Sequence, residues 1–199
     1  MLLHRLKIII LSIYLYNEHQ GFTQLESLLS AFKVKYPSET EMIEAISKHA
    51  TDEKKHYLMF AGYFSRTGYS PISVGSTFGY VDQLISNLFG KSITKLDQTQ
   101  IIENQNLFLK LLRAIMITEE RGLKQVQWLL KRKFILNDPL LKSIFSVIVQ
   151  DEPSHFMPYR NWLEKNHAGL VSWRERLADF RVHYSLIMFK IPLLYLKFW

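Results

Sequence analysis

One five-residue pattern occurs twice in this sequence: Asp and Glu in succession, any two residues, then His. The first copy covers residues 52–56 (DEKKH) and the second covers residues 151–155 (DEPSH). Residues three apart lie on one face of a helix, so the Glu and the His of each copy can approach one metal ion together. Two such pairs facing each other predict a site for two ions. The predicted ligands from the two copies are Glu53, His56, Glu152 and His155.

Two ions inside a helix bundle need two more carboxylates, one from each remaining helix. In an antiparallel pair of helices, residues equally far from the connecting turn lie at the same height. The count from Glu53 reaches Glu18, whose helical neighbours are apolar, whereas Glu26 lies nearer the turn on a polar face. The same count in the second half reaches two adjacent residues. Glu119 has apolar neighbours and is the predicted ligand, whereas Glu120 shares its face with charged side chains and is predicted to lie at the surface.

Four long helical patterns place these residues along the chain. Apolar residues recur at helical spacing over about residues 3–35, 38–67, 99–134 and 139–166. Shorter signals mark two further segments. Residues 68–98 are rich in Gly, Ser and Pro, with a short apolar helix predicted between Tyr80 and Phe89, and residues 170–199 are strongly aromatic.

Capping residues mark several of these helix ends. Ser38, with Glu41 three residues later, matches a capping box at the start of the second long helix. Gly68 is a natural stop for that helix. The sequence NDP at residues 137–139 predicts the start of the fourth long helix. Pro153 lies inside that helix, where it predicts a bend or a π-bulge beside the metal ligands.

The connections predict the topology. Tight turns join the first helix to the second and the third to the fourth, so each pair is expected to be an antiparallel hairpin. The long connection between the pairs lets the chain return along the bundle. The predicted fold is therefore all-α: a ferritin-like four-helix bundle with one long crossover and an additional C-terminal helical segment. We expect a single domain over residues 1–199, with the core bundle at about 3–166 and the extension at 167–199.

With these ligands in place, the sequence resembles the ferritin-like diiron-carboxylate superfamily over about residues 8–166. The doubled Asp-Glu-x-x-His pattern looks most like the oxygen-activating branch, which includes multicomponent monooxygenases, acyl-carrier-protein desaturases and tRNA-modifying diiron hydroxylases. This resemblance implies two iron ions, with manganese as an alternative, and O2 as a co-substrate. It also implies that Asp52 and Asp151 orient the metal-bound histidines.

The expected activity is the O2-dependent oxidation of an organic molecule, apolar or aromatic, by hydroxylation, desaturation or a related reaction. An electron-donor protein would be needed. Iron storage or ferroxidase activity of the bacterioferritin kind stays open as the alternative, although the long crossover exceeds a compact cage subunit. Two other branches fit poorly. Rubrerythrins use a cysteine-bound iron centre and this chain has no cysteine, and ribonucleotide reductase small subunits carry a radical Tyr where this chain has Phe60.

Composition adds limits on partners and location. The absence of cysteine excludes disulfides and suits a reducing compartment, so a cytoplasmic location is expected. The formal charge of +7 is not accompanied by any nucleic-acid-binding motif. The aromatic residues of 180–199, interspersed with basic ones, predict either peripheral contact with a membrane, packing on the bundle or a homodimer contact. The remaining histidines are expected to be ordinary surface or interface residues: His4, His19, His49, His167 and His183.

Overall fold

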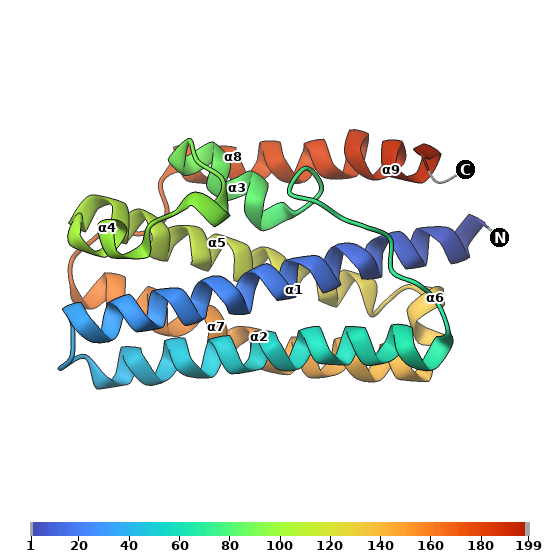
Figure 1. Ribbon diagram of the computed structural model, residues 1–199, viewed down its shortest axis with the longest axis horizontal. Coiled ribbons are helices and arrows are strands. Elements are labelled where there is room, and N and C mark those ends of the chain that lie inside the picture. The colour runs from blue at the N-terminus through green and yellow to red at the C-terminus, as the bar shows by residue number, and fades with distance from the viewer. Residues whose placement is uncertain (1, 198–199) are drawn as a thin grey trace.

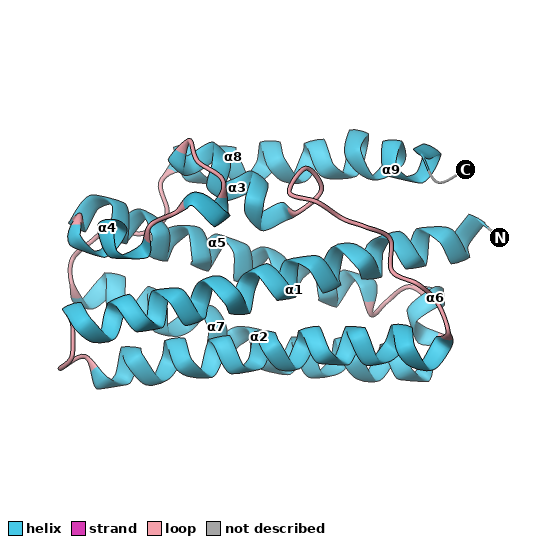
Figure 2. Ribbon diagram, viewed as in Figure 1, coloured by secondary structure: helices cyan, strands magenta, loops and turns pink. Residues whose placement is uncertain are grey.

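Four long helices form a bundle in the computed structural model, which describes residues 2–197, with side chains from residue 4 onward (Figure 1). No strand occurs in this part of the chain (Figure 2). Met1, Phe198 and Trp199 lie outside the described residues, so the structure bears on only part of the aromatic segment expected at 170–199. The long helices are α1 (Leu2–Lys35), α2 (Thr40–Thr67), α5 (Gln105–Leu129) and α7 (Pro139–Lys165).

The remaining elements lie in the crossover, in the second turn and after the bundle. Helix α1 packs along α2, α5 packs along α7, and α2 packs against α7. Between α2 and α5 the chain crosses the bundle through short helices, and after α7 it continues into a further helical rod beside α3 and α5 (Figure 1). These elements are α3 (Tyr80–Phe89), η1 (Ile93–Lys95), α4 (Gln98–Glu103), α6 (Lys133–Leu136), α8 (Trp173–Ser185), the π-helical η2 (Leu186–Lys190) and α9 (Ile191–Lys197).

Most predicted helix ends agree with the structure, but one cap does not. Gly68 ends α2 with a φ of 69°, the left-handed conformation that glycine adopts without strain. The capping box predicted at Ser38 is absent, because α2 begins at Thr40 and Glu39 precedes it without a side-chain cap. The amide of Glu39 instead donates to the carbonyl of Tyr36, so Ser38 lies inside the turn.

The single helix predicted over residues 99–134 is wrong. Asn104 has an extended backbone and divides this segment into α4 and α5. Its side-chain oxygen accepts a hydrogen bond from the amide of Leu107, the usual way in which Asn starts a helix. The second part ends at Leu129, and α6 is a separate short turn. Helix α7, by contrast, stays α-helical through Pro153, so of the bend or π-bulge expected there, the π-bulge is absent.

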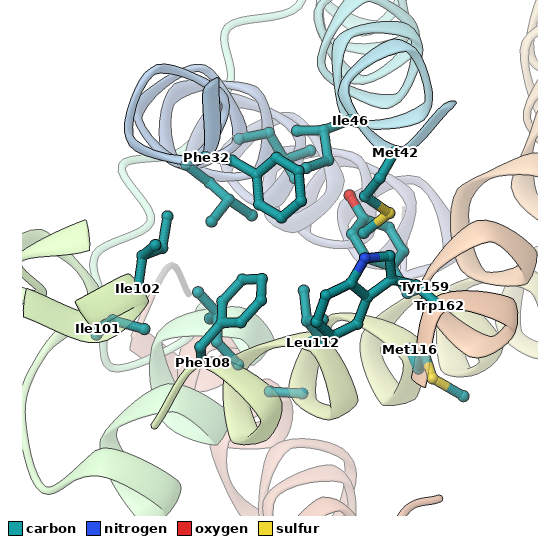
Figure 3. Close-up of a cluster of buried hydrophobic side chains, with 14 of the residues drawn as sticks. Phe32, Met42, Ile46, Ile101, Ile102, Phe108, Leu112, Met116, Tyr159 and Trp162 are labelled. Carbon is teal, nitrogen blue, oxygen red and sulfur yellow. The ribbon is translucent and has the colours of Figure 1, made fainter. Parts of the chain in front are cut away.

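The core of the bundle has two halves, one on each side of a band of buried polar residues. One half contains Phe32, Phe108 and Trp162, whose rings point toward one another from α1, α5 and α7 (Figure 3). The other half gathers Phe60 and Phe145 with neighbouring aliphatic residues. Each large apolar side chain buried in this way stabilises the fold by roughly 1.5–3 kcal/mol. The two halves therefore hold the four helices in register around the polar band.

Two partly buried ion pairs attach the C-terminal rod to the bundle. Glu175 of α8 accepts hydrogen bonds from Arg113, and Asp179 accepts them from Arg121, both arginines lying on α5. Beyond α8 the helix passes through the π turn η2 before Pro192, and α9 then continues it. Within residues 2–197, no helix combines the length and the hydropathy that a membrane span requires.

Asp138 gives a test of how the end of the bundle is held. Its carboxylate caps α7 at the amide of Leu141 (3.2 Å) and accepts hydrogen bonds from Tyr63 of α2 (2.7 Å) and Lys7 of α1 (3.3 Å). We expect Asp138→Ala to lower the free energy of unfolding by about 2 kcal/mol, because a cap and a link between three helices are lost together. Urea denaturation at pH 7 measures this change.

The matched control is Asp97→Ala. Asp97 caps the short helix α4 through the amide of Gln100, and we expect its loss to cost about 1 kcal/mol or less. Burial raises the pKa of Asp138, but its hydrogen bonds from Tyr63, Leu141 and Lys7 lower it more, so the net shift is downward. The contribution of Asp138 should therefore be present at neutral pH and disappear as the pH falls below the usual Asp range. Equal effects of the two substitutions would contradict this account.

Candidate metal centre

The six residues predicted as ligands meet at the middle of the bundle, in the polar band between the two core halves. Four helices contribute, and the histidines are fully buried. The Nδ1 atom of His56 lies 3.4 Å from Glu18, and the Nδ1 atom of His155 lies 3.4 Å from Glu53. The same atom of His155 is 3.8 Å from Glu119 and 4.0 Å from Glu152. Each of the six is therefore within reach of a common centre.

The ligand atoms form two groups that share one carboxylate. In each group the atoms lie within 4.8 Å of one another. The first group contains His49, Glu53, Glu119 and His155, and the second contains Glu18, Glu53 and His56. Glu53 belongs to both, so it lies where two neighbouring ions could share a carboxylate. The Oε2 atom of Glu152 lies beside His155, at the edge of the first group.

His49 is the residue that the sequence interpretation missed. It was expected at the surface or an interface, but its side chain is 1% exposed. Its Nε2 atom lies 3.5 Å from Glu119 and 3.7 Å from Glu53, and its ring stacks on that of His155. Burial lowers its pKa, which favours the neutral imidazole that binds metals. The Nδ1 atom is within hydrogen-bond distance of the hydroxyl of Tyr159, at 3.0 Å.

A signal for His49 was present in the spacing. Residues 49, 53 and 56 are separated by four and three positions, so they share one helical face. The second copy does not show this spacing, because the residue four positions before Glu152 is Ile148 and not a histidine. The centre is therefore less symmetric than the doubled pattern indicates.

The two aspartates of the repeated pattern hold the histidines crosswise. Asp151 lies 2.9 Å from the Nε2 atom of His56, and Asp52 lies 3.3 Å from the Nε2 atom of His155. Each aspartate thus faces the histidine of the other copy. An Nε2–H that donates to a carboxylate leaves the Nδ1 lone pair free for a metal, and both Nδ1 atoms point toward the glutamates. The positions agree with the orienting role that the resemblance implies.

Two lysines keep these aspartates ionised. Lys55 donates to Asp52 at 2.7 Å and to Asp151 at 2.8 Å, and Lys48 also donates to Asp52. Burial raises the pKa of Asp52, but hydrogen bonds from Lys48 and Lys55 lower it more. For Asp151 too, burial raises the pKa, but hydrogen bonds from Lys55 and His56 bring it below the usual value. Ionised aspartates are good acceptors for the imidazole N–H groups.

The buried polar atoms of the centre fit a cationic occupant. Burial, followed by repulsion from neighbouring carboxylates, raises the pKa of Glu53 and Glu152, and burial raises that of Glu18 to about 8. Five ligand atoms are buried without a hydrogen-bond partner, which is costly unless a cation neutralises them. The five atoms are Oε2 of Glu18, Nε2 of His49, Nδ1 of His56, Oε2 of Glu152 and Nδ1 of His155.

Two glycines give the carboxylates room. Gly21 lies one helical turn after Glu18, and a Cβ atom there would come within 2.6 Å of the Oε2 atom of Glu53. Gly122 lies one turn after Glu119, and a Cβ atom there would be 3.2 Å from the Oε1 atom of Glu152. The pattern Glu-x-x-Gly thus recurs on α1 and α5, opposite the doubled pattern on α2 and α7. This second repeat was not among the features from which the site was predicted.

A cavity of about 120 Å³ adjoins the carboxylate side of the centre. Its walls come mainly from α1 and α5, and residues of α3, η1 and α4 also line it. Glu18, Glu53, Glu119 and Glu152 form one end, and most of the other lining side chains are apolar. The cavity is thus a place for a small molecule beside the ligand cluster.

Comparison with known proteins identifies no relative. No family model, no curated protein and no solved structure matches this chain. The functional interpretation therefore depends on the residues and their geometry.

Metal stoichiometry tests the sharing of Glu53. Under anaerobic conditions we expect the unmodified chain to retain two Fe²⁺ ions, Glu18→Gln about one, and Glu53→Gln none, since only Glu53 belongs to both groups. Elemental analysis after desalting measures the content. Glu120→Gln is the matched control, because Glu120 pairs with Arg176 outside the ligand groups. Two ions retained by Glu53→Gln would refute the shared-carboxylate arrangement.

The raised pKa of Glu18 predicts a pH dependence of the metal-free protein. Between the ordinary value of 4.5 and about 8, the folded chain holds a proton on Glu18 that the unfolded chain has released. Stability should therefore fall as the pH rises through this range. Melting temperatures at pH 5 to 8 measure the trend, and Glu18→Gln should reduce its slope because an amide cannot ionise. A slope unchanged by Glu18→Gln would contradict the assignment.

Proposed function

We propose that this chain is a dinuclear-iron oxidoreductase that activates O2 to oxidise a small organic molecule. We further infer that it belongs with the ferritin-like diiron proteins, in their oxygen-activating branch. The observation that carries the proposal is the pair of buried ligand groups joined by Glu53, with a cavity directly beside the carboxylates. A centre that served structure alone would not need adjoining space for a second molecule.

The donor set fits iron. Four carboxylates and three imidazoles, all at least half-buried, offer the oxygen and nitrogen ligands that a pair of ferrous ions accepts. When bound, iron would supply the reduction of O2 and the oxidising power needed to attack a C–H or N–H bond. In a hydroxylation, one oxygen atom of O2 would enter the substrate and the other would leave as water, with two electrons supplied by a donor protein and two protons by the solvent.

The chain's own residues would orient the ligands and exclude water. Asp52 and Asp151 fix the imidazoles so that their Nδ1 atoms face the glutamates. Tyr14 lines the cavity beside Glu18 and Glu152, and its hydroxyl is buried without a partner. Burial, and then the charges of these two glutamates, raise the pKa of Tyr14, so its hydroxyl stays protonated. It is thus a hydrogen-bond donor at the substrate side of the centre.

The proposal includes an interaction surface on the C-terminal rod, which consists of α8, η2 and α9. Large apolar side chains are exposed along α8, η2 and α9, among them Phe180, Phe189 and Leu193. Peripheral contact with a membrane through 180–199 remains a prediction, as does a homodimer contact. A membrane contact would suit an apolar substrate, because such a molecule is concentrated in lipid.

Single-turnover chemistry tests the proposed function. The anaerobic chain, loaded with two Fe²⁺ ions per molecule and mixed with apolar and aromatic compounds, should form an oxidised product when O2 is admitted. Mass spectrometry identifies a product that has gained oxygen or lost hydrogen. We expect Glu53→Gln to lower the yield at least about 100-fold, since both ligand groups lose a member, and Glu120→Gln to retain it.

The storage alternative has a different outcome. Size-exclusion chromatography of the unmodified chain should give a monomer or small oligomer. A large cage that consumes O2, deposits ferric iron and leaves every organic compound unchanged would replace the proposed function with iron storage.

A further inference from the structure

Beyond the ligand cluster, one charged side chain lines the cavity in the described part of the chain: Arg121, whose guanidinium is hydrogen-bonded to Asp179. The remaining walls combine aliphatic side chains, such as Leu25, Ile85 and Leu111, with neutral polar ones. A charged end on a ligand would find no partner there. The lining therefore favours a neutral molecule.

Several neutral polar side chains also line the cavity. Thr118 and Gln125 have hydrogen-bond partners within the chain. Tyr14 and Asn17 belong to the carboxylate end, next to Glu18.

Gln98 is a polar side chain at the other end. Its side chain is 7% exposed and its Nε2 atom donates to Oε1 of Gln24 at 3.3 Å. The Oε1 atom of Gln98 is buried and has no hydrogen-bond partner. A buried amide oxygen needs a donor, from water or from a ligand, and a ligand that replaces the water must supply an N–H or O–H group.

The position of Gln98 relative to the carboxylates gives the direction in which a ligand would lie in the cavity. Gln24 follows Glu18 by six residues on α1, which corresponds to about 9 Å along the helix axis. Gln98 and Leu96 also line an open groove at the surface beside α1 and α4. The amide thus lies at the groove end of the cavity, and the carboxylates lie at the other. A cavity of about 120 Å³ is similar in size to engineered apolar cavities that bind a small aromatic molecule.

We propose that this cavity binds a neutral, mainly apolar small molecule with one N–H or O–H group, which donates to Oε1 of Gln98. The ring or short chain of this molecule extends from Gln98 toward Glu18 and Glu53. The assignment of this molecule as the substrate rests on the proposed function. The recognition of its donor group by Gln98 does not, because it depends on the cavity alone.

Two probes of equal shape test the proposal. Indole carries an N–H group, and indene has the same fused rings without it. Calorimetric titration of the full chain, both metal-free and loaded anaerobically with Fe²⁺, gives the two affinities. We expect indole to bind about five- to tenfold more tightly than indene, the usual effect of one neutral hydrogen bond. Gln98→Leu should bring the ratio to about one.

Gln100→Leu is the matched control. Gln100 lies on the same short helix, but its side chain is exposed and does not line the cavity, so the preference for indole should persist. Circular dichroism and the melting temperature show whether each variant is folded. Should Gln98→Leu fail to fold, the ratio in the unmodified chain still decides. Equal affinities, binding of neither probe, or a preference that survives in folded Gln98→Leu would each overturn the proposal.

The outcomes also separate this proposal from the proposed function. Iron content is measured in the same samples. A preference for indole that depends on Gln98, in a chain that retains no iron, would support this recognition and refute the dinuclear-iron function. Two bound iron ions with equal affinities for the probes would refute the recognition and leave the iron function standing.

Discussion

The structure of this bundle depends on how the mutual repulsion of four buried glutamates is compensated. The side chains of Glu18, Glu53, Glu119 and Glu152 lie close together, and burial removes the water that would screen their charges. Only positive charge, from protons or from metal ions, makes such an arrangement stable. The two apolar halves of the core hold the helices in place against this repulsion. Asp52 and Asp151, kept ionised by Lys48 and Lys55, then set the direction in which His155 and His56 face.

Near-symmetry in the centre follows from the two helical hairpins. One hairpin places its Asp beside the His of the other, and the glycines after Glu18 and Glu119 make matching space on the opposite helices. His49 interrupts the symmetry, since Ile148 takes the corresponding position on α7. The two ligand groups therefore differ in nitrogen content, two imidazoles in one and a single imidazole in the other. Two ions bound there would have unequal surroundings.

Sequence reasoning predicted the long helices and the meeting of six side chains, because both depend on helical periodicity and on residue counts from the turns. It failed where local hydrogen bonds decide. Asn104 was placed inside a helix although its side chain can cap one, and Ser38 was assigned a cap that the turn makes unnecessary. His49 was missed because a single histidine on a helix carries little information until its neighbours in space are known. Gln98 belongs to the same class, since its unpartnered oxygen becomes visible only in three dimensions.

The C-terminal rod has a consequence for the interior that its distance along the chain conceals. Asp179 of α8 accepts hydrogen bonds from Tyr80 and from Arg121, and both of these residues also line the cavity. The carboxylate of α8 therefore neutralises the guanidinium at the cavity wall. If α8 were lifted away, the chamber would acquire an uncompensated cation and a free phenol. The ion pair that attaches α8 to the outside of the bundle thus also determines which charges a bound molecule meets inside the cavity.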